Sequence, residues 1–360
     1  MGNGKDIPSG IDGSPLGTPM VSVVIPAYNS APYIASTLES VFAQTLTNYE
    51  VLVVNDGSPD TPALESGLQA QQSRIRYIKQ ENRGPSGARN AGIRAASGKY
   101  VAFLDSDDSW LPQHLAKQVA LLQADSSLQM VYANGLYLRG DVPVGILFDT
   151  LPQSLPIDLD CLLDERSTVL TSSVVVLRQA LVNVGMFDEQ LRRCEDYDLW
   201  LRLVQSGVGV SFTREIQIRH RQSNGLAASW KLMRRALIQV YEKHLSQGAL
   251  NEEQVWFVRQ KLRRLTMSLE FHDAKQALLD GQFSAALERL QKVQASDPSW
   301  KLAFAQLGLR RFPHLLQSLY RFHLRRVQRQ YLDRGAHSLK KAGFDALAAN
   351  TETLGDPTLT

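Results

Sequence analysis

Short runs rich in hydrophobic residues occur four times in the first part of the chain, separated by polar or Gly/Pro-containing stretches. The runs are Met20–Pro26, Tyr49–Val54, Ile75–Lys79 and Tyr100–Leu104. Such runs are typical of strands buried on both faces of a parallel sheet. Residues 32–44, between the first two runs, carry apolar side chains at helical spacing. The pattern predicts an α/β domain that begins with a right-handed βαβ unit.

Polar loops follow three of these predicted strands and are expected at one edge of the sheet. Tyr28 follows the first strand, Asp56 the second and Asp105 the fourth. The glycine-punctuated stretch Glu81–Gly92, predicted as a loop that leads into a helix ending at Gly98, lies beside them. In open α/β sheets, ligands bind at the edge where the carboxyl ends of the strands lie.

Three carboxylates, Asp105, Asp107 and Asp108, follow the fourth predicted strand directly. Alternating carboxylates can direct several oxygen atoms at one hard cation, and a diphosphate is the natural partner of such a cation. Taken alone, the stretch is equally compatible with a solvated turn that caps a helix beginning near Leu111-Pro112.

The pattern changes to helical spacing after residue 225. Apolar residues recur three to four positions apart in residues 230–245, 252–269, 271–279 and 285–293. A single helical hairpin cannot bury its own face, so residues 274–286 are expected to pack on the preceding domain. The predicted organisation is a loose arm at 1–19, an α/β domain at 20–225, a helical region at 226–345 and a loose tail at 346–360.

Composition narrows the class of protein. The chain has 360 residues, 44% of them hydrophobic, which is enough for a sizeable core. Its two cysteines, Cys161 and Cys194, give no disulfide framework, so a reducing compartment is expected. With no apolar run of about 18 residues and no secretory signal pattern, we expect a cytoplasmic protein.

Positive charge is concentrated towards the carboxyl end. Ten Lys and Arg residues lie between Lys301 and Lys341, against Asp333 alone, and apolar residues are interleaved with them. This pattern fits amphipathic helices on an anionic membrane surface, at its cytoplasmic face. It fits equally well a solvated basic helix that docks on the more acidic front domain. No nucleic-acid-binding motif is present, so nucleic acid is not an expected partner.

Four motifs in this order resemble glycosyltransferase family 2, whose nucleotide-sugar-binding domain has the GT-A fold. They are Val-Val-Ile-Pro-Ala-Tyr-Asn (23–29), Val-Asn-Asp-Gly-Ser (54–58), Gly-Pro-Ser-Gly-Ala-Arg-Asn-Ala-Gly (84–92) and Phe-Leu-Asp-Ser-Asp-Asp (103–108). The resemblance covers residues 20–110, and a later match extends it to about residue 225. It implies an inverting transferase that moves a sugar from a nucleotide-diphosphate donor, with a UDP-sugar expected, to a hydroxyl of a glycan or lipid-linked glycan in polysaccharide biosynthesis of the cell envelope.

The resemblance also assigns roles on the donor side. Tyr28, two residues after Pro26, would supply the flat surface for the base, and Asp56 would accept its imide N–H. From the glycine-rich stretch around Gly87, Arg89 is the expected contact to the diphosphate or sugar, because a guanidinium matches paired oxygens. Arg83 is a further candidate. Each of these residues also has a purely structural alternative: Tyr28 could be a packed loop tyrosine, Asp56 a turn-forming aspartate and Arg83 a surface arginine.

For the metal, the resemblance implies Mn²⁺ or Mg²⁺ with Asp107 as direct ligand. Asp105 would contact the ribose or sugar, or bind the metal through water. All-oxygen ligands suit these cations better than Zn²⁺. His220 matches the family's closing-loop histidine only loosely and is a further candidate for the metal or the diphosphate; its alternative is a structural histidine.

The general base is expected in Cys194-Glu-Asp-Tyr197, where acids occupy the first turn of a predicted helix. The resemblance assigns the base to Asp196, with Glu195 as the fallback. Simple helix capping is the alternative, because acids are favourable near a helix N-terminus. Two other functions also fit an α/β sheet with acidic metal ligands: a sugar-phosphate nucleotidyltransferase and a non-catalytic module that binds metal or nucleotide sugar.

Overall fold

The computed structural model describes residues 17–221, 230–324 and 326. The chain divides into two compact units, Met1–Val258 and Arg259–Thr360. The predicted arm up to residue 16, the basic residues from 327 onwards and the predicted tail from 346 lie outside the described residues. None of the helices in the described ranges is both long and apolar enough to span a membrane.

A mixed sheet forms the centre of the first unit, with nine strands in the described residues. They are β1 (Val21–Ala27), β2 (Tyr49–Asp56), β3 (Arg76–Gln80), β4 (Tyr100–Phe103), β5 (Ser109–Trp110), β6 (Leu128–Arg139), β7 (Val142–Ile146), β8 (Val175–Leu177) and β9 (Gly209–Arg221). The strand order is β3-β2-β1-β4-β8-β6-β9-β5, and β7 pairs with β6. The first four strands are mutually parallel, and β8 is antiparallel to both neighbours. The predicted fold class is therefore confirmed.

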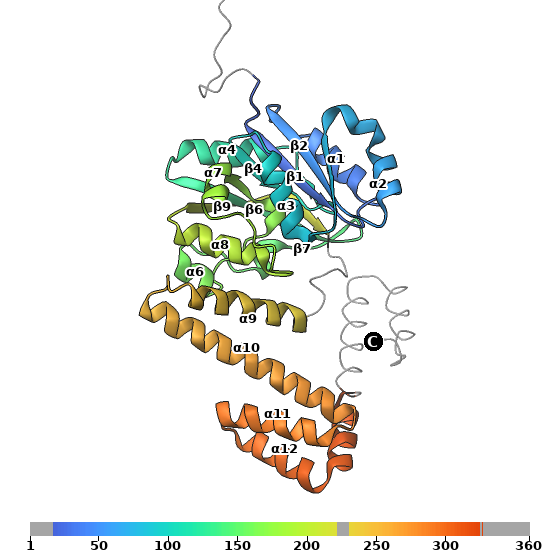
Figure 1. Cartoon of the computed structure of the whole chain (residues 1–360), viewed down its shortest axis with the longest axis vertical. Helices are drawn as coiled ribbons and strands as arrows, with labels where there is room; N and C mark the ends of the chain where they lie inside the picture. The colour runs from blue at the N-terminus through green and yellow to red at the C-terminus, as the bar shows by residue number, and fades with distance from the viewer. Residues whose placement is uncertain (1–16, 222–229, 325, 327–360) are drawn as a thin grey trace, which may run out of the picture. The chain divides into compact units, whose positions relative to one another are not determined.

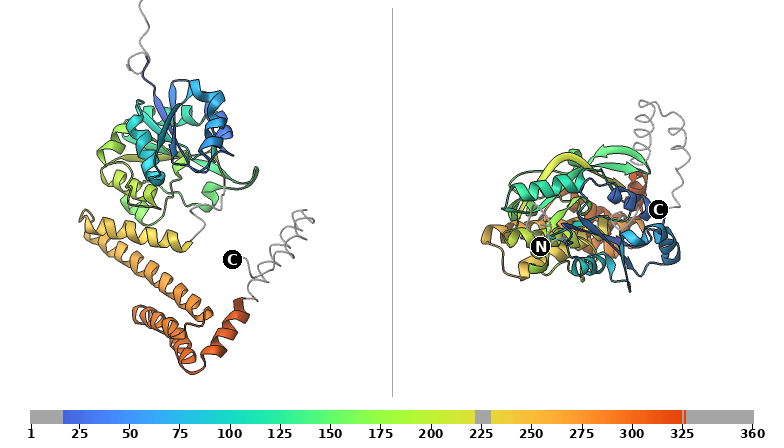
Figure 2. Two further views of the ribbon diagram at one scale, coloured as in Figure 1. Left: turned by 45° about the vertical axis from the view of Figure 1, so that its right-hand side comes forward. Right: turned by 90° about the horizontal axis from the view of Figure 1, so that it is seen from above.

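Helices lie on both faces of this sheet (Figures 1 and 2). The first unit contains the helices α1 (Ile34–Phe42), α2 (Thr61–Leu68), α3 (Gly84–Ala95), α4 (His114–Ala124), α5 (Leu147–Thr150), α6 (Leu159–Leu163), α7 (Arg178–Asn183), α8 (Glu195–Gln205) and α9 (Trp230–Ser246), with 3₁₀ turns at Gln69–Arg74 and Thr171–Ser173.

Alternation of side chains along β1 explains the two faces. Val23 and Ile25 belong to the core that includes residues of α1, α2 and α4. Val24 points to the other face, where α3 lies so close that a Cβ atom on Gly92 would be 2.3 Å from the Val24 Cγ1 atom. Only glycine allows this approach, which brings the amino end of α3 to the edge where β1, β2 and β4 end.

Two boundaries at this edge differ from those predicted. Strand β2 continues through Asp56, and helix α3 begins at Gly84, so much of the predicted glycine-rich loop is helical. Pro85 is compatible with this start, because the first helical turn does not need its N–H group. Arg89 is consequently fixed on a helix.

The second unit has its own helical core. Helix α10 runs from Glu252 to Leu279 without the predicted break near residue 270, and it is followed by α11 (Phe283–Ser296), α12 (Trp300–Arg311) and a helical segment at 313–324. Ala286 and Leu290 of α11 pack with Leu309 of α12, and Figure 1 shows the two helices side by side. The hairpin around Gly281 thus buries apolar side chains within its own unit, where α12 and residues 313–324 supply apolar partners. That it also packs on the preceding domain stays a prediction.

Candidate active site

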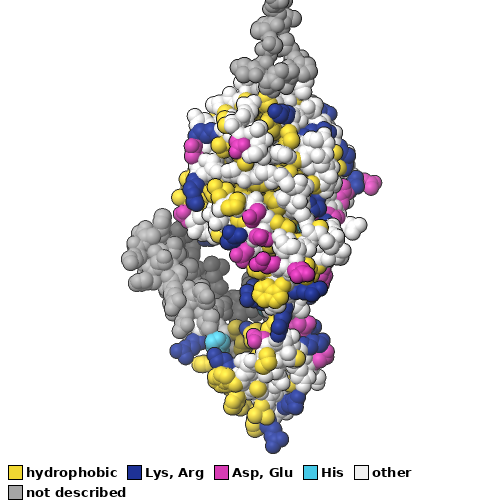
Figure 3. All heavy atoms as spheres, turned by 90° about the vertical axis from the view of Figure 1, so that its left-hand side faces the viewer, with side chains coloured by type: hydrophobic (Ala, Val, Ile, Leu, Met, Phe, Trp, Pro, Cys, Tyr) yellow, Lys and Arg dark blue, Asp and Glu magenta, His cyan; other side chains and the backbone are white. Residues whose placement is uncertain are grey.

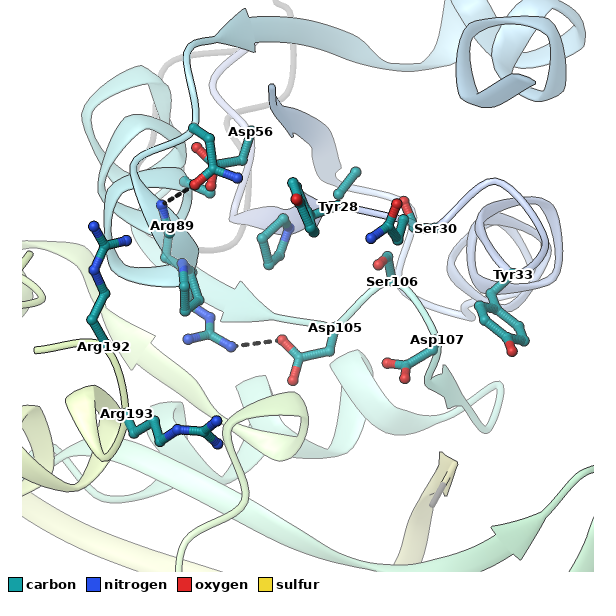
Figure 4. Close-up of a pocket in the computed structure, with 17 residues that line it drawn as sticks. Tyr28, Ser30, Tyr33, Asp56, Arg89, Asp105, Ser106, Asp107, Arg192 and Arg193 are labelled. Carbon is teal, nitrogen blue, oxygen red and sulfur yellow. Dashed lines mark hydrogen bonds and ion pairs between the residues drawn. The ribbon is translucent and has the colours of Figure 1, made fainter. Parts of the chain in front are cut away.

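A cavity of about 780 Å³ opens at the carboxyl ends of β1, β2 and β4 (Figure 4). Its lining brings together six residues predicted from sequence, which are Pro26, Tyr28, Asp56, Arg89, Asp105 and Asp107. These residues come from four separate segments of the chain. The parallel topology carries them to one edge because successive loops after parallel strands share that edge.

The side of the cavity formed by β1 and β2 presents an aromatic ring and a carboxylate. Tyr28 is half-exposed, at 49% of its surface, so its ring is available to a ligand. Asp56 is buried, and its Oδ1 atom accepts hydrogen bonds from Gln80 Nε2 at 2.7 Å and from the backbone N–H of Arg83 at 2.8 Å. These two donors fix the carboxylate at the cavity wall.

Arg89 lies at the centre of an ion-pair chain. Its side chain is buried and donates to Asp105 Oδ1 at 2.8 Å and to Glu195 Oε1 at 2.9 Å. Burial alone would lower the pKa of Arg89, but the two carboxylates raise it above its ordinary value, so the guanidinium is charged. Its charge is therefore engaged on two sides by protein carboxylates.

The turn after β4 concentrates negative charge. Burial, and then the carboxylates of Asp108 and Asp105, raise the pKa of Asp107 to about 6. Figure 4 shows the side chains of Asp105 and Asp107 directed into the same space. A cation bound there would relieve the repulsion between them.

His220 contacts Asp108, not the two acids that line the cavity. Its Nδ1 atom lies 3.0 Å from Asp108 Oδ2, and the backbone N–H of Arg221 donates to Asp108 Oδ1 at 2.9 Å. Burial lowers the pKa of His220, but Asp108 and the neighbouring acids raise it overall. Within residues 17–221, 230–324 and 326, no group of three or more His, Cys, Asp or Glu side chains is placed to hold one metal ion.

The amino end of α8 supplies the two acids predicted as base and fallback. Asp196 Oδ2 accepts a hydrogen bond from Thr171 Oγ1 at 3.0 Å, and its Oδ1 accepts one from the backbone N–H of Tyr197 at 2.8 Å. Glu195 is buried against Arg89. Burial and the adjacent Asp196 raise the pKa of Glu195, while Arg89 opposes the rise. The two neighbouring carboxylates therefore have different surroundings.

Two residues predicted on the donor side do not line the cavity. The side chain of Arg83 pairs with Glu189 and is about half exposed. A Cβ atom on Gly87 would lie 2.4 Å from the Cβ of Arg83, so glycine at this position allows Arg83 to pack against α3. The backbone N–H of Arg83 nevertheless contributes by orienting Asp56.

Arg192 and Arg193, which line the cavity, were missed by reasoning from sequence. A tandem pair of arginines one residue before the two acids of α8 is a signal that could have drawn attention to them. Asp108 was recognised as one of three clustered carboxylates, but its contacts with His220 and the backbone of Arg221 were not predicted. The partner of Asp108 is 112 residues away and leaves no local signal.

The chain is similar to known glycosyltransferases in sequence. The family described as Glycosyl transferase family 2 matches residues 22–141. An uncharacterized glycosyltransferase of Rickettsia bellii is 34% identical over 211 residues, which cover 56% of this chain but only 30% of that protein. The chain likewise spans less than two thirds of the other Rickettsia relatives.

Two named bacterial proteins are covered more fully. WfgD of Escherichia coli, a UDP-Glc:alpha-D-GlcNAc-diphosphoundecaprenol beta-1,3-glucosyltransferase, is 33% identical over 52% of this chain and 70% of WfgD. TuaG of Bacillus subtilis, a putative teichuronic acid biosynthesis glycosyltransferase, is 30% identical over 69% of this chain and 90% of TuaG.

Solved structures share the fold. S. aureus TarS 1–349 in complex with UDP-GlcNAc aligns with a TM-score of 0.57 and 18% identity, over 84% of this chain and 92% of that one. The mannosyltransferase PcManGT from Pyrobaculum calidifontis, in complex with GDP-Man and Mn²⁺, aligns with a TM-score of 0.54 and 19% identity, over 85% of each chain. At these identities the likeness concerns the fold alone.

Proposed function

The chain belongs to glycosyltransferase family 2 and has the GT-A fold, and from this premise we propose that it transfers a sugar from a nucleoside diphosphate sugar to a hydroxyl group of a glycan or lipid-linked glycan, with inversion at the anomeric carbon. Membership of this family favours a glycosyltransferase over the sugar-phosphate nucleotidyltransferase and the non-catalytic binding module. The transfer, the donor, the acceptor, the metal and the base are our proposal.

One observation carries the proposal: a single cavity combines an exposed aromatic ring, a fixed carboxylate and an acidic turn. Tyr28 and the carboxylate of Asp56 suit a nucleobase, since one offers a stacking surface and the other an acceptor for an imide N–H. Asp105 and Asp107 lie in the same cavity, beside the space that a diphosphate would occupy. A UDP-sugar donor is further supported by the UDP-sugar named for WfgD and the UDP-GlcNAc bound to TarS.

The acidic turn suits a divalent cation with oxygen ligands. Burial and the neighbouring carboxylates of Asp108 and Asp105 raise the pKa of Asp107, and a cation at this point would offset both effects on the ionised carboxylate. Asp107 would hold Mn²⁺ or Mg²⁺ directly, whereas Asp105, whose Oδ1 atom is engaged by Arg89, would do so through water. Such a cation would neutralise charge on the departing diphosphate. The Mn²⁺ bound to PcManGT supports this choice.

We assign the general base to Asp196 in preference to Glu195. Glu195 is buried in an ion pair with Arg89, whereas Asp196 accepts hydrogen bonds from Thr171 and the backbone N–H of Tyr197 and has no ion-pair partner among the described residues. A carboxylate oriented in this way can take the proton of the attacking hydroxyl. A single attack from the face opposite the leaving diphosphate inverts the anomeric carbon.

The test is incubation of the purified chain with a panel of UDP- and GDP-sugars, with Mn²⁺, Mg²⁺ or EDTA, and with glycan and diphosphate-linked acceptors. We expect metal-dependent transfer from one class of donor and a product whose anomeric configuration, read by NMR, is opposite to that of the donor. Release of pyrophosphate from a nucleoside triphosphate, or retention of configuration, would contradict the proposal.

The second unit carries a surface that supports membrane contact. Seven aromatic and leucine side chains of residues 300–324 are exposed to between 57% and 70% of their surface; they are Trp300, Phe304, Leu307, Phe312, Leu315, Leu319 and Phe322. Lys301, Arg310, Arg311 and Arg321 lie among them in the sequence, and Figure 3 shows hydrophobic and basic side chains gathered over these helices. Apolar groups beside positive charge match an anionic lipid surface, so we propose that the enzyme binds peripherally to the cytoplasmic face of a membrane, where a lipid-linked acceptor would lie.

A further inference from the structure

Three arginines line the cavity, but their surroundings differ. Arg89 donates hydrogen bonds to Asp105 at 2.8 Å and to Glu195 at 2.9 Å, so its charge is already paired within the protein. Arg192 and Arg193 have no hydrogen-bond or ion-pair partner among the described residues, and the Nη1 atom of Arg193 is buried without a partner. A buried guanidinium nitrogen without an acceptor is costly, which suggests that a ligand supplies the acceptor.

The segment that bears the two arginines is anchored at both ends. Asp188 accepts a hydrogen bond from Lys243 Nζ at 2.8 Å, and the Sγ atom of Cys194 lies 3.1 Å from the Sδ atom of Met233. Both anchors come from α9. The arginines therefore reach the cavity from a held segment, and Figure 4 shows their side chains at its wall.

The backbone turn after Arg193 is strained in a way that favours this placement. Cys194 has φ of +54°, in the left-handed region, although it is not glycine. Such a conformation is unfavourable for a non-glycine residue and persists where the surroundings enforce it. The turn lets Arg193 line the cavity while α8 begins at the next residue with Glu195.

We propose that Arg192 and Arg193 form a phosphate-binding subsite of the cavity. Guanidinium groups bind phosphate oxygens through paired hydrogen bonds, and the pair lies on a different wall from Asp107 (Figure 4). The inference rests on the proposed function, which supplies two phosphate-bearing substrates. The phosphate is either the diphosphate of the nucleotide sugar or a diphosphate attached to the acceptor sugar.

The first experiment measures the affinity of the full chain for UDP and for uridine by calorimetry in the presence of Mn²⁺. If the subsite holds the donor diphosphate, Arg192→Met and Arg193→Met each weaken UDP binding about ten- to a hundred-fold and leave uridine binding unchanged. Arg193→Lys should weaken UDP binding less than Arg193→Met does, because an ammonium group keeps the positive charge. It should not match the wild type, because it lacks the paired N–H groups of a guanidinium.

The second experiment compares a diphosphate-linked N-acetylglucosamine acceptor with the same sugar as an alkyl glycoside that lacks phosphate. If the subsite holds the acceptor, UDP affinity is unchanged, and the variants raise KM about ten-fold or more for the diphosphate-linked acceptor only. Arg94→Met is the matched control, because Arg94 is an exposed residue of α3 outside the cavity lining.

The outcomes separate this inference from the proposed function. Variants that match an active wild-type enzyme in both experiments would overturn the subsite alone. A wild-type chain that binds no UDP and glycosylates neither acceptor would overturn the proposed function and the subsite with it. A thermal melt of each variant identifies loss of folding, and Arg192→Met is the safer variant because Arg192 is exposed.

Discussion

Arg89 and Glu195 are 106 positions apart in the sequence, yet Arg89 Nη1 donates to Glu195 Oε1 at 2.9 Å inside the protein. The other side of the guanidinium is held by Asp105. One buried cation thus joins the acidic turn after β4 to the first turn of α8. The acids assigned to the donor and to the acceptor are therefore fixed relative to each other, which is what a direct transfer between two substrates requires.

Replacing Asp107 should remove metal-dependent transfer without unfolding the protein. If Asp107 is the direct ligand, Asp107→Asn lowers kcat/KM by about a hundred-fold or more with saturating Mn²⁺ or Mg²⁺, since several kcal/mol of charge stabilisation are lost. The matched control is Asp164→Asn, a change of an exposed aspartate outside the cavity. Turnover close to that of the wild type would contradict the role.

The same variant has a predicted stability signature. In EDTA, the pKa of Asp107 is raised to about 6 by burial and by Asp108 and Asp105, so the ionised carboxylate destabilises the fold above that pH. The penalty is absent below the ordinary value of about 4 for an aspartate. Asp107→Asn should therefore melt at the same temperature as the wild type or higher at pH 7.5, and the difference should shrink at pH 5. A markedly lower melting temperature would show a structural role for Asp107.

Base selectivity should depend on Asp56. Asp56→Ala removes one acceptor for an imide N–H, so affinity for UDP should fall by about 1 kcal/mol or somewhat more, while affinity for a diphosphate with a different base, such as ADP, should hardly change. Asp56→Asn is the conservative companion, because it keeps the shape that Gln80 and Arg83 contact. An unchanged ratio of the UDP and ADP dissociation constants would exclude Asp56 from base recognition.

Acid stability should depend on Glu50, far from the cavity. Burial alone would raise its pKa, but hydrogen bonds from Ser22, Ser97 and Arg76 lower the pKa of Glu50 to about 2. An acid whose folded pKa lies below its unfolded value stabilises the fold above the unfolded pKa of about 4.5, and this contribution disappears as the pH falls towards 2. Glu50→Gln should therefore lower the melting temperature at pH 7 and lose that effect between pH 4.5 and pH 2. A difference independent of pH would contradict this account.

If the exposed apolar and basic side chains of residues 300–324 bind a membrane, as we propose, the binding should have an apolar and an electrostatic component. Trp300→Ser with Phe304→Ser should weaken sedimentation with anionic vesicles at any salt concentration, because each buried aromatic contributes about 1.5–3 kcal/mol. Arg310→Gln with Arg311→Gln should instead reduce the salt-sensitive part, about 1 kcal/mol for each charge. All four side chains are exposed on α12, so the helix should persist in both variants. Concentration-dependent dimers that vanish in Trp300→Ser, without vesicle binding by the intact chain, would show that a second copy covers this surface.

Local patterns predicted the strands and the acids at their ends. β1, β2 and β4 are runs rich in apolar residues. Local sequence is therefore enough to predict a buried strand that ends just before Asp105. The burial of Arg89 could not be predicted, because it depends on Glu195, which the folded chain brings to α3 from the first residue of α8. The same holds for Asp108, whose partner His220 is brought near by the antiparallel pairing of β5 with β9. Contacts between distant segments are set by packing, and one sequence carries no local signal for them.

The Arg89 ion pair also bears on which carboxylate acts as base, and the two variants Asp196→Asn and Glu195→Gln decide it. Asp196→Asn keeps the shape of the side chain and removes its basicity, so kcat should fall by roughly 10²- to 10⁴-fold. Donor affinity should hardly change, because the residues proposed to bind the donor, Tyr28, Asp56 and Asp107, lie at the carboxyl ends of β1, β2 and β4.

Glu195→Gln should cost less in kcat, but it leaves Arg89 with one carboxylate partner, so it should lower the melting temperature, which Asp196→Asn should not. Thr171→Val serves as a third variant, because it removes the hydrogen bond to Asp196 Oδ2 and should give an intermediate loss of kcat. The deciding measurements are single-turnover rates and UDP-sugar dissociation constants for all three. If Glu195→Gln lost more activity than Asp196→Asn while the latter stayed active, Glu195 would be the base, and its ion pair with Arg89 would have to open during the reaction.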